Sequence, residues 1–309
     1  MLLHKPRFWD YKKSNLFSLL LLPFSFIISL SNWINFLFKK KKFKIKTICV
    51  GNIYVGGTGK TPISIEIFKI LKKFKVKSVF IKKNYFNHKD EIRLLSKIGP
   101  IINLNSRVKS LENAQKKKFK LAIIDDGLQD KSLEYDLKIV CFDKKNFIGN
   151  GKLVPAGPLR EKLDSLRKYN IVFLNGLGKL EKKILLKIKK INNEIEIFET
   201  TPIIINKNRM KRKKKYLIFS GIGNPSSFKE LLRKENFKIS KSITFPDHYN
   251  FSNSDISRIK DQAKLLKSKI LTTEKDYLRI KKENRKGINF IKIRFRIYNK
   301  KKLIRLLNK

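Results

Sequence analysis

A glycine-rich run, GNIYVGGTGKTP, extends from Gly51 to Pro62 and contains the residue types that bind phosphates. Glycines let backbone N–H groups curl around a phosphate, and a helix that begins there adds the positive end of its dipole. In such a P-loop, Lys60 would reach the β- and γ-phosphates and the Thr61 hydroxyl would bind Mg²⁺. The strict G-x-x-x-x-G-K-[ST] pattern has glycine where this chain has Tyr54, so the loop is a variant.

A second run, AIIDDGLQD from Ala122 to Asp130, is typical of an apolar strand that ends in two carboxylates. A Walker B strand ends in this way and places a carboxylate beside the P-loop, where it holds Mg²⁺ directly or through water. The alternative is that these carboxylates only cap a turn or a helix. Together the two runs predict a nucleotide site, with Tyr54, Val55, Gly56, Gly57, Thr58, Gly59, Lys60, Thr61 and Gln129, and a metal site, with Thr61, Asp125 and Asp126.

The elements that must position these residues alternate between strand and helix patterns. Apolar, β-branched runs predict strands at 47–50, 78–81, 121–124, 138–142 and 171–174. Between the first two, apolar residues recur at helical spacing from Ile63 to Phe74. This βαβ order predicts an α/β fold, a P-loop NTPase-like and mostly parallel sheet covered by helices.

A second block follows the polar stretch 206–215. It predicts strands at 216–219, 239–245, 269–272 and 288–297 and a helix at 256–266. We therefore expect three parts: an N-terminal membrane-associated helix (1–38), a P-loop kinase core domain (39–205) and a smaller C-terminal α/β domain (206–309).

The N-terminal part contains 25 residues without a charge, from Ser14 to Phe38, with lysines on both sides. About 20 apolar residues cross a bilayer, but Pro23 and the polar residues of the segment favour a helix in the interface almost as well. A cleaved signal peptide fits less well, because a basic run follows and no small-residue cleavage site precedes it. A buried core helix is the remaining alternative. We expect membrane attachment, by span or by interface.

The composition limits the classes of protein. The chain has 73 Lys and Arg and 25 Asp and Glu, a net charge of +48, yet 41% of its residues are hydrophobic, which argues against disorder. The lysines are spread over the whole chain, which favours compositional drift over a nucleic-acid-binding face, so a basic nucleic-acid-binding ATPase is the second choice. A GTPase would need N-K-x-D, and the run NKNR at 206–209 lacks the Asp. Cys49 and Cys141 lie in apolar runs, which indicates a reducing compartment.

Six motifs together resemble a known family. They are GNIYVGGTGKTP, DDGLQD, GNGKLVPAGPLRE (149–161), SGIGNPSSF (220–228), FPDHYNF (245–251) and LTTEKD (271–276). In this order, over nearly the whole chain, they resemble the tetraacyldisaccharide 4'-kinases, the lipid A 4'-kinases. The resemblance implies transfer of the γ-phosphoryl group of ATP to the 4'-hydroxyl of an acylated glucosamine disaccharide 1-phosphate, giving lipid IVA. It implies catalytic domains on the cytoplasmic face of the inner membrane, and no obligate protein partner.

The resemblance also implies a catalytic Asp paired with a His. These map to Asp90 in KDEIRLL, where Lys89 replaces the family's glycine, and to His248 in FPDHYNF. Asp90 would orient the sugar hydroxyl and accept its proton late, and His248 would hold that carboxylate. The alternative for Asp90 is a solvated acid at the start of a helix, and the alternative for His248 is a capping or core histidine. Arg160 is a candidate phosphate clamp, because a guanidinium neutralises phosphoryl charge with a fixed geometry.

The chain departs from the family pattern at two more places. The family's S-R-G-Y-G-R after the second strand is replaced by KKNYF, Lys82 to Phe86. The His usual after D-D-G-[FL]-Q is Asp130. The first departure affects expected substrate contacts, and the second removes a possible structural hydrogen bond.

Overall fold

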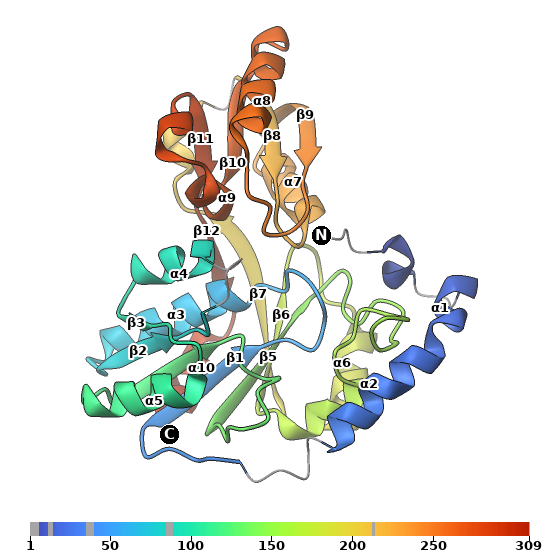
Figure 1. Cartoon of the computed structure of the whole chain (residues 1–309), viewed down its shortest axis with the longest axis vertical. Coiled ribbons are helices and arrows are strands. Elements are labelled where there is room, and N and C mark those ends of the chain that lie inside the picture. The colour runs from blue at the N-terminus through green and yellow to red at the C-terminus, as the bar shows by residue number, and fades with distance from the viewer. Residues whose placement is uncertain (1–5, 12–14, 35–39, 85–88, 212–213, 309) are drawn as a thin grey trace.

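The computed structural model describes residues 6–11, 15–34, 40–84, 89–211 and 214–308. Within these residues the strands form an eight-stranded sheet, ordered β12-β7-β6-β5-β1-β4-β2-β3, and a four-stranded sheet, ordered β11-β10-β8-β9. The sheets form two lobes that lie end to end along the longest axis (Figure 1). Among the strand ladders of the described residues, β12 with β7 is antiparallel and the others are parallel. The expected α/β fold with a mostly parallel sheet is confirmed.

The first lobe is built around β1, which lies between β4 and β5. Its β1 and β4 are buried over nearly their whole length, which explains their continuous apolar sequences. The five strands predicted for this region are present. The strands of the lobe, apart from β12, are β1 (Lys46–Gly51), β2 (Ser78–Ile81), β3 (Ile101–Ile102), β4 (Leu121–Asp125), β5 (Leu137–Asp143), β6 (Ile171–Asn175) and β7 (Glu196–Ile204).

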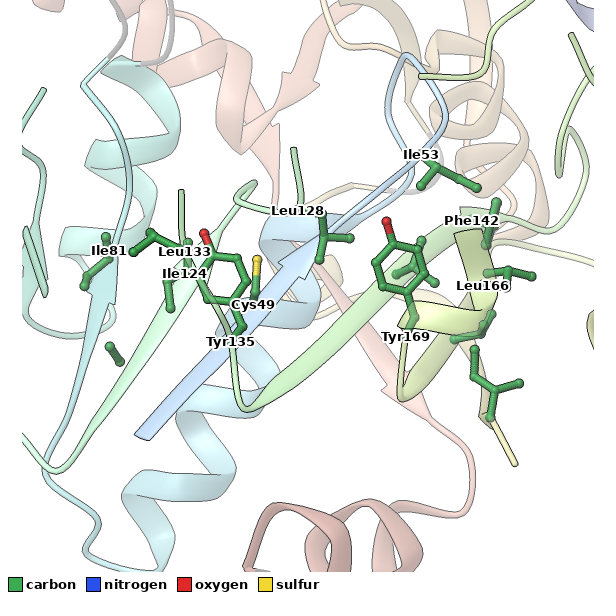
Figure 2. Close-up of a cluster of buried hydrophobic side chains, with 14 of the residues drawn as sticks. Cys49, Ile53, Ile81, Ile124, Leu128, Leu133, Tyr135, Phe142, Leu166 and Tyr169 are labelled. Carbon is green, nitrogen blue, oxygen red and sulfur yellow. The ribbon is translucent and has the colours of Figure 1, made fainter. Parts of the chain in front are cut away.

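Helices cover both faces of this sheet. They are α3 (Lys60–Lys73), α4 (Lys89–Ser96), α5 (Arg107–Lys116), α6 (Lys182–Ile191) and α10 (Lys300–Asn308). One face carries the hydrophobic cluster of Figure 2, in which Cys49 of β1 lies among Ile124, Leu128 and Tyr135. The opposite face packs against α3 and α10. Both cysteines, which lie in apolar runs of the sequence, are free and fully buried, and burial raises the pKa of Cys141 to about 12.

The second lobe has a parallel sheet of its own. Its strands are β8 (Lys215–Ser220), β9 (Lys238–Thr244), β10 (Lys269–Thr273) and β11 (Ile288–Ile291), and its helices are α7 (Pro225–Lys234), α8 (Asn253–Leu265) and α9 (Glu274–Arg279). The predicted helix at 256–266 corresponds to α8. This helix starts with a capping box, in which Ser252 and Asp255 satisfy each other's backbone N–H groups.

The expectation of one strand over 288–297 is wrong. The segment forms two strands in different sheets: β11 joins the second lobe, and β12 (Ile293–Ile297) returns to pair with β7 of the first. The final helix, α10, then inserts Leu303 and Leu307 into the core of the first lobe. The chain therefore passes between the lobes through β7 and again through β12 (Figure 1). The division of the chain into a kinase core domain (39–205) and a smaller C-terminal domain (206–309) stays a prediction.

The N-terminal region lies along one flank of the first lobe (Figure 1). It forms η1 (Arg7–Asp10), α1 (Leu16–Leu20) and α2 (Leu22–Ile34), while residues 1–5, 12–14 and 35–38 of the predicted segment lie outside the described residues. In the described part of the chain, the helices are too short or too polar to cross a membrane.

The polarity of α1 and α2 is inverted. Ser18 and Ser25 are buried and donate hydrogen bonds of 2.9 Å to the carbonyl oxygens of Ala156 and Leu153. Large apolar side chains point outward instead; Phe17 is 68% exposed and Phe26 is 70% exposed. This arrangement excludes the buried core helix.

We predict that Leu303→Ala lowers the free energy of unfolding of the first lobe by about 3 kcal/mol, because it leaves a cavity in a closed core. Arg305→Ala, on the exposed face of the same helix, is the control and should change it by less than about 0.5 kcal/mol. Chemical denaturation monitored by fluorescence would measure both. Equal effects of the two substitutions would show that α10 does not contribute to this core.

Candidate active site

The glycine-rich loop joins β1 to α3, as the sequence predicted. Gly59 precedes the helix at φ +84°, a left-handed conformation that favours glycine. A Cβ there would lie 2.5 Å from the Phe295 ring and 2.9 Å from Nδ2 of Asn175, so the space is closed as well. Asn175 also donates a 2.7 Å hydrogen bond to the carbonyl of Thr58. The loop that leads to Lys60 is therefore held from below by β6 and β12.

The second lobe contacts this loop from the other side. A Cβ on Gly57 would lie 3.2 Å from the backbone nitrogen of Asn224, and a Cβ on Gly223 would collide with the backbone nitrogen of Gly57. The segment SGIGNPSSF thus packs directly on the P-loop, and glycine is needed on both surfaces because the two backbones are so close. The predicted nucleotide site lies at the junction of the lobes.

The Tyr54 side chain is buried in a small apolar cluster beside the glycine-rich loop. It is 3% exposed, packs with Leu153 and Leu159, and donates a 2.8 Å hydrogen bond from its hydroxyl to Oδ1 of Asp10. Burial, and then the hydrogen bond to Asp10 and its negative charge, raise the pKa of this phenol far above its usual value. The side chain thus joins the loop to the N-terminal region, and the place of Tyr54 in the nucleotide site stays a prediction.

Asp125 ends β4 beneath the P-loop and is fully buried. Its carboxylate accepts hydrogen bonds from the hydroxyls of Thr61, at 3.0 Å, and Ser64, at 2.9 Å. Nζ of Lys82 lies 2.7 Å from Oδ2 of the same group. The pairing of Thr61 with a Walker-type carboxylate, expected from the sequence, is present in the structure.

Asp126 points toward three other predicted site residues. Its Oδ1 lies 3.7 Å from Nζ of Lys60 and 3.7 Å from Nη1 of Arg160, which in turn donates a 3.1 Å hydrogen bond to Gln129. Burial disfavours the charged carboxylate, but the positive charges of Lys60, Arg160 and Lys82 outweigh that effect and lower the pKa of Asp126 to about 2. Asp126 is therefore ionised at neutral pH.

The oxygen atoms of this cluster suit Mg²⁺. The described residues contain no group of three His, Cys, Asp or Glu side chains that could hold a metal alone. Mg²⁺ in kinases, however, binds one or two carboxylates together with phosphate oxygens and water. Asp126 Oδ1 is buried and accepts no hydrogen bond from the described chain, and the Thr61 oxygen keeps lone pairs after donating to Asp125. Thr61, Asp125 and Asp126 thus fit a magnesium site that a nucleotide would complete.

Asp90 and His248 come from different lobes and lie together. Asp90 is in the first turn of α4 and 2% exposed, and its Oδ1 is 3.5 Å from Nδ1 of His248. Burial works against the charged carboxylate, but the nearby His248 ring and the charges of Lys275 and Arg279 hold the pKa of Asp90 far below its usual range. The predicted pair is brought together as expected.

Sequence reasoning missed the groups that surround this pair. Arg279 donates to Asp90 Oδ2 through Nε, at 3.0 Å, and Nη2, at 2.7 Å. Lys275 Nζ lies 2.9 Å from Glu91 and 3.4 Å from Nε2 of His248. A signal existed: Lys275 lies in the LTTEKD motif, and Arg279 follows one helical turn later on α9. What the sequence could not reveal is that α9 faces α4.

A polar cavity of about 470 Å³ opens beside Asp126. It is lined by Lys83, Arg107, Lys131 and Arg160, together with Asp126, Gln129, Asp130 and Ser132. Asp130, which replaces the family's histidine, accepts a 3.0 Å hydrogen bond from Arg107. Asp130 therefore makes a structural hydrogen bond of its own at this position. The excess of basic side chains makes the cavity suitable for an anionic group.

The fold and site define the class of protein. A glycine-rich loop at a helix N-terminus, beside a strand that ends in two carboxylates, is the arrangement of P-loop phosphotransferases. The family model described as tetraacyldisaccharide-1-P 4'-kinase matches residues 17–99 and 89–309. The chain therefore belongs to the tetraacyldisaccharide 4'-kinase family, and the resemblance noted in the sequence is confirmed.

Known relatives agree with this assignment. The chain is 46% identical over 309 residues to the tetraacyldisaccharide 4'-kinase of Pelagibacter ubique, covering 100% of this chain and 98% of the relative. It is 32% identical to that of Rickettsia bellii over 295 residues, 89% of each chain. A crystal structure of LpxK from Aquifex aeolicus in complex with ATP has the same fold, with a TM-score of 0.69 and 24% identity over 95% of this chain and 99% of that chain. The chain is an enzyme, a kinase.

Proposed function

We propose that this chain uses ATP and Mg²⁺ to phosphorylate the 4'-hydroxyl of tetraacyldisaccharide 1-phosphate, a step of lipid A biosynthesis. The observation that carries the proposal is the meeting, at the lobe junction, of a P-loop with an Asp–His pair that neither lobe provides alone. The full-length similarity to tetraacyldisaccharide 4'-kinases supports the choice of substrate.

The P-loop and its neighbours would bind the phosphates. Lys60, at the start of α3, would neutralise β- and γ-phosphate charge, and the fork of Arg160 would contact the transferring group. Thr61, Asp125 and Asp126 would hold Mg²⁺, which when bound supplies further charge neutralisation. The basic cavity beside Asp126 would admit the phosphorylated sugar.

Asp90 would act on the acceptor hydroxyl. Its strongly lowered pKa makes it a weak base, so its main contribution is to orient the hydroxyl, with proton acceptance late in a loose transition state. His248 approaches one oxygen of this carboxylate while Arg279 holds the other, which leaves Asp90 little freedom to turn. This geometry supports a positioned dyad rather than a solvated helix cap.

The N-terminal helices would place the enzyme on the cytoplasmic face of the inner membrane. The exposed apolar side chains of α1 and α2 suit a helix that lies in the membrane interface, with its serines turned toward the protein. The acylated substrate of the enzyme would lie in the cytoplasmic leaflet of this membrane, while ATP would come from the cytosol. This surface favours a lipid substrate over nucleic acid, despite the +48 charge.

The function is tested directly with radiolabelled ATP and tetraacyldisaccharide 1-phosphate, with product separation by thin-layer chromatography. Wild-type chain should form a labelled bisphosphate, and Lys60→Ala should lose nearly all of this activity because phosphate charge is no longer neutralised. Circular dichroism would check that the variant is folded. Near wild-type turnover by a folded Lys60→Ala would remove the P-loop assignment, and an inactive wild type would remove the substrate assignment.

We predict that Asp90→Ala lowers kcat about a hundredfold, with little change in the KM for ATP. His248→Ala should lower kcat in the same direction. Because the two side chains act as one unit, the double variant should be no slower than about the slower single variant. Steady-state kinetics of all four proteins would measure this, and a double loss equal to the product of the single losses would argue against a dyad.

We predict that replacing Phe17 and Phe26 with Ser weakens binding to phospholipid vesicles about thirtyfold, if each ring contributes about 1 kcal/mol. Vesicle flotation would measure the binding. Both side chains are exposed, so stability should hardly change. Leu265→Ser, 82% exposed at the end of α8, is the matched control. If the control weakens binding equally, α1 and α2 are not the attachment surface.

A further inference from the structure

Lys82 is the most deeply buried lysine of the described chain. It directly follows β2 and is 1% exposed, in the KKNYF segment where the chain departs from the family pattern. Its Nζ lies 2.7 Å from Oδ2 of Asp125 and 2.5 Å from Oε2 of Glu91. One ammonium group thus joins the carboxylate below the P-loop to the residue next to Asp90.

Electrostatics explain why a cation is needed there. Asp125 is fully buried and the Glu91 side chain is 13% exposed, and burying a carboxylate without a counter-charge is strongly unfavourable. Asp126 adds a third negative charge beside them. Two other lysines lie at the edges of this cluster. Lys60 lies beside Asp126, and Lys275 lies beside Glu91, but neither lies between Asp125 and Glu91. Lys82 lies between the two carboxylates that connect the nucleotide loop to α4.

We propose that Lys82 is a positioning residue, a built-in cation that holds Asp125 and α4 in the reactive arrangement before any metal binds. The proposal rests on the proposed kinase function. In the free enzyme, the ammonium of Lys82 takes one oxygen of Asp125, while the Thr61 and Ser64 hydroxyls complete the hydrogen bonding of that group. Free Mg²⁺ therefore gains little from this carboxylate until a nucleotide supplies phosphate oxygens.

If this proposal is right, Mg²⁺ should be able to replace the positive charge of Lys82 when that side chain is removed. Lys82→Met keeps most of the side-chain volume but leaves three neighbouring carboxylates with one cation fewer. Mg²⁺ should then bind the nucleotide-free variant and replace the lost charge. The Glu91 segment would also lose its link to β4, so α4 and Asp90 would be placed less accurately, although the P-loop itself would be intact.

Two measurements test this. The first is thermal unfolding without nucleotide, with EDTA or with MgCl₂. We expect Mg²⁺ to shift the Tm of the wild type little, and to raise the lowered Tm of Lys82→Met clearly. The second is phosphoryl transfer at saturating Mg²⁺, where kcat of Lys82→Met should fall about tenfold to a hundredfold while the KM for ATP changes less than about threefold.

Lys144→Met is the matched control. Lys144 is also buried, at 5% exposure, and its Nζ lies 3.3 Å from Glu199, outside the carboxylate cluster. This variant should lose stability without gaining any response to Mg²⁺. The same result for Lys82→Met, or an unchanged kcat, would overturn the proposal. If Lys82→Met does not fold, Lys82→Gln is measured in the same way, and failure of both to fold even with Mg²⁺ would mean a purely structural lysine.

The thermal measurement needs no lipid, so it separates this proposal from the proposed function. An inactive wild type whose Lys82→Met variant is still stabilised by Mg²⁺ would retain Lys82 as the built-in cation and would remove the lipid kinase. If the wild type is active but Mg²⁺ does not raise the Tm of Lys82→Met, the lipid kinase function is retained and the role of Lys82 as a built-in cation is removed.

Discussion

The site depends on one constraint: buried carboxylates must be paired with cations. Two of these carboxylates, Asp90 and Glu91, lie on α4 of the first lobe. Their cationic partners lie on α9 of the second lobe: Arg279 pairs with Asp90, and Lys275 pairs with Glu91. Removing one member of such a pair leaves an uncompensated buried charge, which is far more unfavourable than losing a surface ion pair. These ion pairs therefore hold the two lobes together where Asp90 meets His248, and they also keep Asp90 ionised.

The backbone reinforces this arrangement from two directions. Glycines on the P-loop and on SGIGNPSSF allow the lobes to touch without side chains between them. On the other side, β12 returns to the first sheet directly after β11, so only Lys292 separates strands of the two lobes. A connection this short limits how the lobes can move apart. Phe295 of β12 also packs under Gly59, so the return strand supports the phosphate-binding turn as well.

Local patterns predicted much of this structure, and long-range pairing explains the rest. Five strands of the first lobe and the P-loop were predicted because apolar runs and glycines are visible within a few residues, whereas β3 and β7 were not predicted. The split of 288–297 was missed because Ile291, Lys292 and Ile293 contain no turn residue, and the sheet that each half joins is decided by distant strands. Arg279 was missed for the same reason, since 189 residues separate it from Asp90. The Asp90–His248 pair could be expected only from the resemblance to a family.

The inverted helices connect the proposed membrane face to the chemistry. Ser18 and Ser25 hydrogen-bond to Ala156 and Leu153, and Trp9 donates to the carbonyl of Pro155, so the N-terminal region is fixed to the segment GNGKLVPAGPLRE. Four residues after Ala156, the same segment presents Arg160 to Asp126. The backbone N–H of Arg160 also donates a 2.7 Å hydrogen bond to the carbonyl of Ile53 in the P-loop. A lipid headgroup held at this face would therefore lie near Arg160 and Asp126, the proposed phosphate and metal ligands. The serines face the protein because their hydrogen bonds fix the helices to this loop, and the exposed apolar side chains form the surface that is proposed to contact the bilayer.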